Sequence, residues 1–439
     1  MNGHFGGRAP SRRTIIIGVV GVGAGFFGAR LGAHAALMGR QAEWAQQYDA
    51  DPTQALVRSR TPLLSQQTID ATVAAVQHYQ ALSDAGGWPA FQPRRLLRLG
   101  MRGPDVQALR RRLMITDDLP RVAGMSENFD SFVSAAVRRF QARHGLAVSG
   151  VVDRETLRAM NVPATMRLQQ LTLNSVRLRE YAGLNDPRYV VANIPAARVE
   201  TVENNVVITR HKAGVGRIDR PSPIMRTKAI QINFNPYWTV PASIIKKDLI
   251  PLMQKHPHYL EENRIRIFDK SGQEVQASSI NWDSYQAENY RFRQDSGAGN
   301  ALGVVRININ NPYGVYMHDT NEKGVFGDDY RFVSSGCMRL QDVRDYVTWL
   351  LKDNPGWDRQ RVDDTINSGQ RLDVDITPPV PVYWVYITAW ATPDGIVQFR
   401  DDIYKRDGLN VDAAMSPSKL AREELAAQQR SIVEPVQQQ

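Results

Sequence analysis

The spacing of apolar residues changes once along this chain, near residue 189, and the change limits the folds that it can adopt. Before that point apolar residues recur at helical spacing, as in segment 68–82, where Ile69, Val73 and Val76 share one face. After it, apolar and polar residues alternate, which is typical of half-buried strands. We predict strands at 189–194, 198–209 with a break at Asn204-Asn205, 229–234, 306–310, 382–389 and 396–399. One later helix is expected from Leu340 to Leu351.

The sequence therefore predicts an α+β multidomain protein, and its 439 residues are enough for two or three domains. Residues 41–93 are expected to form a helical scaffold segment. Residues 95–162 are predicted to be a small three-helix domain, in which Pro104 occupies a first-turn position and Asp130 and Asp153 cap the next two helices. Residues 185–408 form the β-rich domain, and residues 410–439 a disordered or helical tail.

Segment 256–302, inside the β-rich domain, is polar and irregular. A loop of that length within a compact domain is usually functional. We interpret it as a lid over a substrate site.

The N-terminus has the features of an export signal. Arg8, Arg12 and Arg13 precede the apolar stretch 15–29, which is short for a membrane-spanning helix, and Ala33-His34-Ala35 offers a cleavage site. We predict that residues 1–35 are a signal peptide, and Arg12-Arg13 resembles a twin-arginine signal. The alternative is an uncleaved anchor in the inner membrane. Both interpretations place the protein in the periplasm, with a membrane partner only if the segment is retained.

The formal net charge of +9 is modest, and four of the positive charges lie before Ala36, so a chain that starts there carries +5. That charge is too small to indicate a nucleic acid partner, and it is compatible with an anionic wall or membrane surface. Arginines crowd the start of the three-helix domain between residues 94 and 112. They form either a solvated helix face or a wall-binding patch.

Cys337 is the only cysteine, so it forms no intramolecular disulfide and is either an inert buried side chain or a nucleophile. It lies in Ser334-Ser335-Gly336-Cys337-Met338-Arg339, on a turn directly before the helix expected at Leu340. We therefore expect the helix dipole and Arg339 to lower the pKa of the thiol from its free value of about 8.5. The backbone N–H groups of Gly336 and Cys337 are expected to hold an oxyanion.

His318 is the candidate general base, because among the eight histidines it alone ends a strand-like run, 314–317, and precedes Asp319-Thr320. Together with the glycine turn of Cys337 and with Arg339, it predicts an activated cysteine nucleophile.

Two runs of this sequence, Tyr316-x-His318-Asp319-Thr320 and Ser334 to Arg339, resemble the active-site signature of the L,D-transpeptidase (YkuD-type) catalytic domain, and more narrowly of its large YcbB-like branch. Runs at 189–195, 235–241 and 300–303 support the resemblance. Residues 99–157 are similar to the peptidoglycan-binding domain found beside many wall enzymes. Many family members have histidine where Ser335 stands, which leaves the function of Ser335 open.

The resemblance implies that Cys337 attacks a tetrapeptide stem of peptidoglycan and that His318 accepts its proton. A main-chain carbonyl, of Asp319 or Thr320, orients the histidine. The acceptor amine belongs to another stem, giving 3-3 cross-links, or to an envelope protein. Carbapenems are expected to acylate the same cysteine. The candidate oxyanion or supporting residues are Gly336, Ser335, Arg339 and Asp319.

Tyr316 and Trp238 are candidate substrate walls, and packing into the core is an equal alternative for both. Two other functions stay open: an L,D-carboxypeptidase, which resolves the same acyl-enzyme with water, and a catalytically silent wall-anchoring protein. The sequence has no H-E-x-x-H motif, no cysteine pair and no nucleotide-binding fingerprint. No metal or cofactor is therefore expected.

Overall fold

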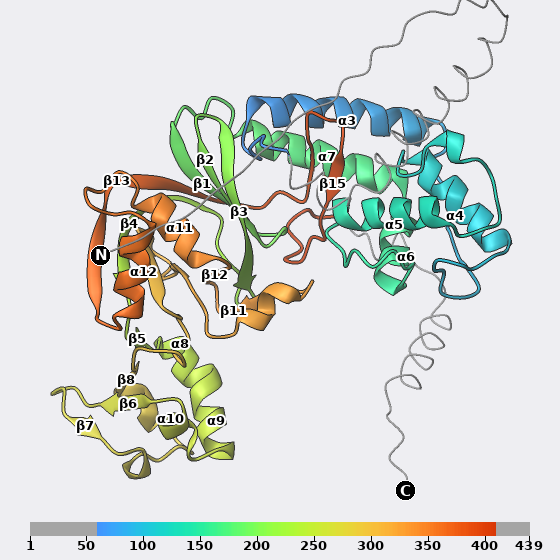
Figure 1. Ribbon diagram of the computed structural model, residues 1–439. Helices are drawn as coiled ribbons and strands as arrows, with labels where there is room; N and C mark the ends of the chain where they lie inside the picture. The colour runs from blue at the N-terminus through green and yellow to red at the C-terminus, as the bar shows by residue number, and fades with distance from the viewer. Residues whose placement is uncertain (1–58, 410–439) are drawn as a thin grey trace, which may run out of the picture. The chain divides into compact units, whose positions relative to one another are not determined.

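The computed structural model describes residues 59–409, so the predicted leader and C-terminal tail lie outside the described residues. Within 59–409, no helix is long and apolar enough to cross a membrane. Figure 1 shows helices before residue 180 and a large sheet after it. The predicted α+β class is confirmed.

The scaffold helix α3 (Gln66–Asp84) includes the predicted helical stretch 68–82, and its N-cap Ser65 accepts a hydrogen bond from the Thr68 N–H. Residues 41–58 of the predicted scaffold segment lie outside the described residues. Beside it lies α7 (Ala164–Arg179), a helix that the sequence analysis did not predict. Both helices pack against the hairpin of β14 (Ala389–Ala391) and β15 (Val397–Phe399). The indole N–H of Trp88 donates to the Val162 carbonyl at 3.0 Å and so ties the end of the scaffold to the next domain.

The three-helix domain has α4 (Pro104–Ile115), α5 (Ser131–Arg143) and α6 (Arg154–Asn161), with a short 3-10 turn at Arg121–Ala123. The predicted caps are confirmed: Asp130 accepts from the Val133 N–H and Asp153 from the Thr156 N–H. The helices enclose their own apolar core around Leu109, Val137 and Phe140.

The main sheet follows the strand order β11-β3-β12-β10-β9-β4-β13-β1-β2. Its strands are β1 (Arg188–Asn193), β2 (Arg198–Glu203), β3 (Val206–Gly216), β4 (Met225–Phe234), β9 (Val305–Ile309), β10 (Met317–His318), β11 (Phe332–Ser334), β12 (Met338–Leu340) and β13 (Leu372–Val385). The long strand β3 pairs with β2 through residues 206–212 and with β12 through 213–214, so the sheet closes on itself.

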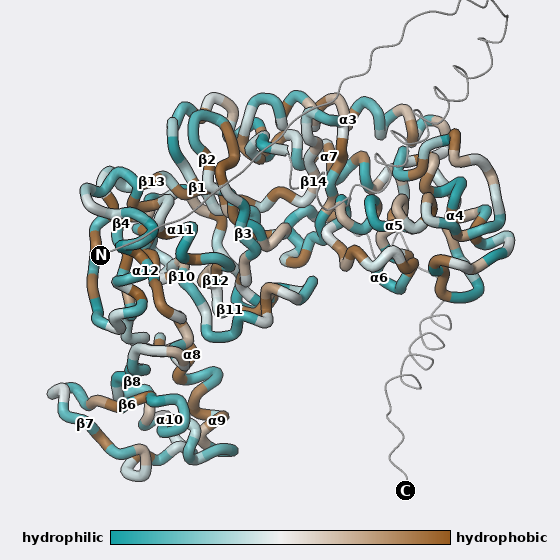
Figure 2. The backbone as a smooth tube through the Cα atoms, viewed as in Figure 1, coloured by the Kyte–Doolittle hydropathy of each residue, from teal (hydrophilic) through white to brown (hydrophobic). Residues whose placement is uncertain are grey.

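One face of this sheet packs against α11 (Val343–Leu350) and α12 (Arg359–Asn367) over the largest apolar core, which includes Met317, Met338 and Tyr346. Figure 2 shows apolar and polar residues alternating along these elements, as expected for elements with one buried face. Helix α12, with its N-cap Asp358, was not predicted. The predicted helix start at Leu340 is wrong, because residues 338–340 extend as β12 and the helix begins at Val343.

Segment 256–302 is not an irregular loop. It belongs to a small folded unit, with helical turns α8 (Ala242–Ile244), η2 (Ile245–Leu249), α9 (Ile250–Lys255) and α10 (Tyr259–Glu262), and a sheet of order β5-β8-β6-β7. The strands are β5 (Trp238–Thr239), β6 (Ile265–Phe268), β7 (Glu274–Val275) and β8 (Arg291–Gln294); short 3-10 turns occupy Ala277–Ser279 and Tyr285–Asn289. Ile250, Ile267 and Phe292 lie in its own apolar core. That this small unit acts as a lid over a substrate site stays a prediction.

Candidate active site

The two residues singled out as a catalytic pair lie on neighbouring strands. β10 and β12 pair in parallel with Met317 opposite Met338 and His318 opposite Arg339. Both methionines face the core, so His318 and Arg339 face the other side of the sheet. Tyr316 and Cys337 lie two residues before each, just outside the strands, and Cys337 is partly buried against the edge of the same core. The pairing of two residues on each strand thus brings the two segments together. Cys337 directly precedes β12, so it lies diagonally across from His318 on β10.

His318 is buried, and its Nδ1 donates a hydrogen bond to the carbonyl oxygen of Asp319. Because a carbonyl can only accept, this bond puts the proton of the neutral ring on Nδ1 and leaves Nε2 as an acceptor. Burial, with smaller effects of Arg339 and Arg306, lowers the pKa of His318 to about 3. The ring is therefore neutral at physiological pH and able to take a proton.

Cys337 is not beside a helix N-terminus, and the expected lowering of its pKa is wrong. Three residues of strand separate it from the region where α11 begins, so the helix dipole does not act on the sulfur. Burial raises the pKa of the thiol to about 11, against opposing effects of the Tyr316 backbone N–H, Arg306, Arg339 and the Tyr316 hydroxyl. The resting pair is therefore a thiol and a neutral imidazole, with no preformed thiolate.

Tyr316 is hydrogen-bonded to the side chain of Cys337. Its hydroxyl shares a hydrogen bond with the Cys337 sulfur, and the indole N–H of Trp238 donates to the same hydroxyl at 3.1 Å. Arg306 lies over the Tyr316 ring at 4.9 Å from its centroid. Burial raises the pKa of Tyr316, which keeps the phenol protonated as a donor. The two candidate substrate walls thus form a chain of donors that ends on the sulfur.

The turn that carries Cys337 is braced by Ser334. Its hydroxyl donates to the Cys337 carbonyl at 2.6 Å and accepts from the Gly336 N–H at 3.1 Å. Gly336 has φ +111°, a conformation that favours glycine, and its carbonyl accepts from Ser222 at 2.9 Å. Since the Gly336 N–H is engaged, it is not available to an oxyanion, whereas the Cys337 N–H donates to no residue within 59–409.

Ser335, which stands where many relatives have histidine, accepts a hydrogen bond from Arg220 at 2.9 Å. The same guanidinium pairs with both carboxylate oxygens of Asp248, one of them at 2.8 Å. Asp248 lies on η2 of the small unit, and Trp238 on its β5. The small unit therefore reaches the surroundings of Cys337 at two points: through Arg220 it contacts Ser335 in the turn, and through Trp238 it contacts Tyr316.

Asp319 and Arg339 support the histidine in different ways. The Asp319 carboxylate accepts from the Val304 N–H at 3.1 Å and pairs with Lys323, so it fixes a loop and does not face the sulfur. Arg339 pairs with Glu322 and packs beside Gly214, which has no side chain to exclude it. Its charge favours the thiolate and disfavours the imidazolium.

Sequence reasoning missed Arg306, Arg220, Ser222 and Asp248. Arg306 lies opposite His318 on β9, and only the strand register reveals it. The others come from loops and from the small unit, and no local motif marks them. No group of three or more His, Cys, Asp or Glu residues that could hold a metal ion occurs among the described residues.

Comparisons with known proteins agree with this geometry. The family model for the L,D-transpeptidase catalytic domain, YkuD, matches residues 187–369, and the model for a peptidoglycan-binding domain matches residues 102–160. A curated protein of Haemophilus influenzae named "Putative L,D-transpeptidase" is 32% identical over 240 residues, covering 54% of this chain and 48% of that protein. The chain thus matches about half the length of this relative.

Two solved L,D-transpeptidases show weaker similarity. The protein from Mycobacterium smegmatis is 16% identical, over 45% of this chain and 58% of that chain, with a TM-score of 0.23. The protein from Stackebrandtia nassauensis is 12% identical, over 68% of this chain and 96% of that chain, with a TM-score of 0.25. Scores this low support no conclusion about the site. The two family matches do support one: residues 187–369 match the L,D-transpeptidase catalytic domain of the YkuD family, and residues 102–160 of the same chain match a peptidoglycan-binding domain.

Proposed function

We propose that this protein is an exported peptidoglycan L,D-transpeptidase that uses Cys337 as its nucleophile and His318 as its general base. The observation that carries the proposal is the β10–β12 register, which sets His318 diagonally across from the cysteine while the Asp319 carbonyl fixes its tautomer. The substrate is the tetrapeptide stem, and the acceptor is an amine of a second stem or of an envelope protein.

The neutral resting pair favours proton transfer in step with attack. The sulfur forms a bond to the carbonyl carbon of the third stem residue as its proton moves to Nε2 of His318. His318 then gives this proton to the departing amine of the terminal D-alanine, leaving a thioester. The acceptor amine attacks the thioester, His318 takes up its proton, and the thiol is restored as the new amide forms.

The charge that develops on the carbonyl oxygen needs donors. We assign this function to the Cys337 N–H, which has no partner among residues 59–409, and not to the Gly336 N–H, which Ser334 occupies. The positive charges of Arg306 and Arg339, which favour the thiolate, also favour an anionic intermediate. Both arginines destabilise the protonated form of His318, which promotes transfer of its proton to the departing amine.

The small unit around Trp238 and Asp248 supports transfer to an amine over hydrolysis. It contacts Tyr316 and, through Arg220, Ser335, so it can exclude water from the thioester. The peptidoglycan-binding domain raises the local concentration of acceptor stems.

The test is to incubate the purified protein with tetrapeptide muropeptides and to analyse the products by liquid chromatography and tandem mass spectrometry. Dimers joined through the third residues of both stems support the proposal, and a Cys337→Ala variant should give none. Tripeptides alone, with acceptor in large excess, would reassign the protein as an L,D-carboxypeptidase. No product from protein with a reduced Cys337 would favour a protein acceptor or a wall anchor.

A further inference from the structure

Three arginines gather away from the active site without acidic partners. Arg198 lies on β2, Arg331 precedes β11, and Arg400 follows β15. None of the three forms an ion pair with a described carboxylate. Arg400 donates to the carbonyls of Arg143 and Phe399 at 3.0 and 2.6 Å, and Arg331 to the Asp328 carbonyl at 2.8 Å. The Arg198 guanidinium makes no hydrogen bond or ion pair with any residue in 59–409.

These charges repel one another in a poorly solvated place. Burial, with the fields of Arg198 and Arg331, lowers the pKa of Arg400 to about 9, and burial is also the main cause that lowers the pKa of Arg198 and of Arg331. Glu200 lines the same cavity, but it already pairs with Arg210 at 2.9 Å and accepts from the Leu63 N–H. Asp328 and Asp329 act on Arg331, and Asp401 on Arg400, without forming an ion pair with either arginine, and their effect is smaller than that of burial. Guanidinium groups do not give up their protons in proteins, so this cluster needs a counter-charge.

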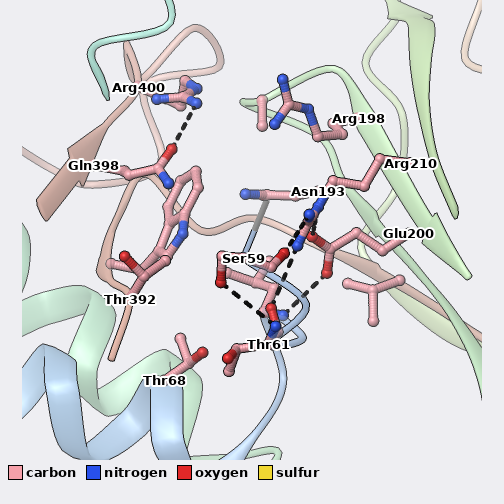
Figure 3. A pocket seen from close by; sticks show the side chains of 14 residues that line it. Ser59, Thr61, Thr68, Asn193, Arg198, Glu200, Arg210, Thr392, Gln398 and Arg400 are labelled. Atoms are coloured by element: carbon pink, nitrogen blue, oxygen red, sulfur yellow. Dashed lines mark hydrogen bonds and ion pairs between the residues drawn. The ribbon is translucent and has the colours of Figure 1, made fainter. Parts of the chain in front are cut away.

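A small cavity of about 40 Å³ opens between Arg198 and Arg400. Figure 3 shows Arg400 and Gln398 on one side of it and Arg198, Arg210 and Glu200 on the other. Gln398 uses its oxygen to accept from Arg400 at 3.1 Å, so its amide N–H groups are left as donors. Trp390 also lines the cavity, and its ring centroid lies 4.9 Å from the guanidinium carbon of Arg400. The wall is therefore rich in donors and net positive, and its carboxylate is already engaged.

We propose that this cavity is a binding site for one small oxyanion, a carboxylate or a phosphate, held between Arg198 and Arg400. Its size allows about three water-sized groups, which suits such an ion and excludes a sugar or a peptide chain. Arg198 and the Gln398 amide donate to the anion, and Arg331 and Arg400 add charge. The site is independent of the cysteine chemistry.

The position gives the anion a structural consequence. Arg400 is joined to the last turn of α5 through the Arg143 carbonyl, and Arg143 in turn donates weakly to the Val397 carbonyl at 3.4 Å. The opposite wall of the cavity is the β1–β3 part of the catalytic sheet. An anion between them stabilises the junction of the peptidoglycan-binding domain with the catalytic domain.

The test is thermal unfolding of the full chain in sodium phosphate, sodium acetate and sodium chloride at equal ionic strength, with isothermal titration calorimetry for the anion that responds. The Tm should rise and saturate with phosphate or acetate, beyond any effect of chloride, and comparing these two salts identifies the anion. Arg198→Gln should abolish the rise, and its Tm in chloride should equal or exceed that of the native chain, because a repelled charge is gone. The exposed control Arg154→Gln removes the same charge and should keep the response.

A second variant keeps the proposal testable if Arg198→Gln does not fold. Gln398→Glu places a carboxylate of nearly the same shape in the cavity, so it should raise the Tm in chloride and abolish the response to added anion. An equal rise in native protein and Arg198→Gln would overturn the proposal. The proposal would also be overturned if the native chain did not respond to either anion and the Gln398→Glu variant had a lower Tm in chloride than the native chain. The chain itself would then neutralise the cluster.

Discussion

Replacing Tyr316 by phenylalanine removes a side-chain hydroxyl that is hydrogen-bonded to the Cys337 sulfur and leaves the ring in place. Hydrogen bonds to charged groups contribute about 1.5–3 kcal/mol, and one pKa unit corresponds to about 1.4 kcal/mol. The bond favours the thiolate, so its loss should raise the pKa of the thiol by about one to two units. At any pH below the native value of about 11, the thiolate fraction should fall about 10- to 100-fold.

The assay is the second-order rate of Cys337 alkylation by iodoacetamide between pH 7 and pH 11.5. The native rate should climb steadily with pH and show no plateau near neutrality, because burial raises the pKa of the thiol to about 11. Tyr346→Phe is the matched control, since its hydroxyl contacts the Met317 sulfur at 3.4 Å on the opposite face of the sheet. Identical pH–rate curves for Tyr316→Phe and native protein, or a native plateau at pH 7, would refute this account of the thiol.

The remaining predictions concern the base, the nucleophile and its turn. His318→Asn should slow acylation by a carbapenem about 10²- to 10⁴-fold in stopped-flow measurements. Because burial lowers the pKa of His318 to about 3, the acylation rate of the native protein should not fall as the pH is lowered through 6, and such a fall would contradict the assignment. Intact-protein mass spectrometry should find one carbapenem adduct on native protein and none on Cys337→Ala. Gly336→Ala should cost about 1–2 kcal/mol of stability, because φ is +111°, and should also slow acylation, whereas Gly395→Ala, at φ +81°, should affect stability alone.

The sequence predicted those parts of the site that lie in local motifs. Cys337 and His318 could be found because a strand end and a glycine turn leave recognisable residues in order, whereas the carbonyl beside His318 was implied by the family resemblance alone. The environment of the Cys337 thiol could not be predicted, because the sequence of residues 338–340 is equally compatible with a short strand and with the first turn of a helix. The small unit was misinterpreted because strands of two to four residues are too short to show alternation. Arg220 and Asp248 reach Ser335 across 115 and 87 positions, beyond any local pattern.

The double pairing of β3 has a consequence for amide hydrogen exchange. β3 is held by β2 along its first half and by β12 at residues 213–214, so the amides in these pairings exchange only when the sheet as a whole opens. β11 is a three-residue edge strand, paired with β3 alone, and it frays at much lower cost. The turn that carries the sulfur joins β11, which loosens locally, to β12, which is paired on one side with β10 and on the other with β3. The β11 end of this turn can therefore move to admit a substrate, while the β12 end, which is paired with the strand of His318, stays fixed.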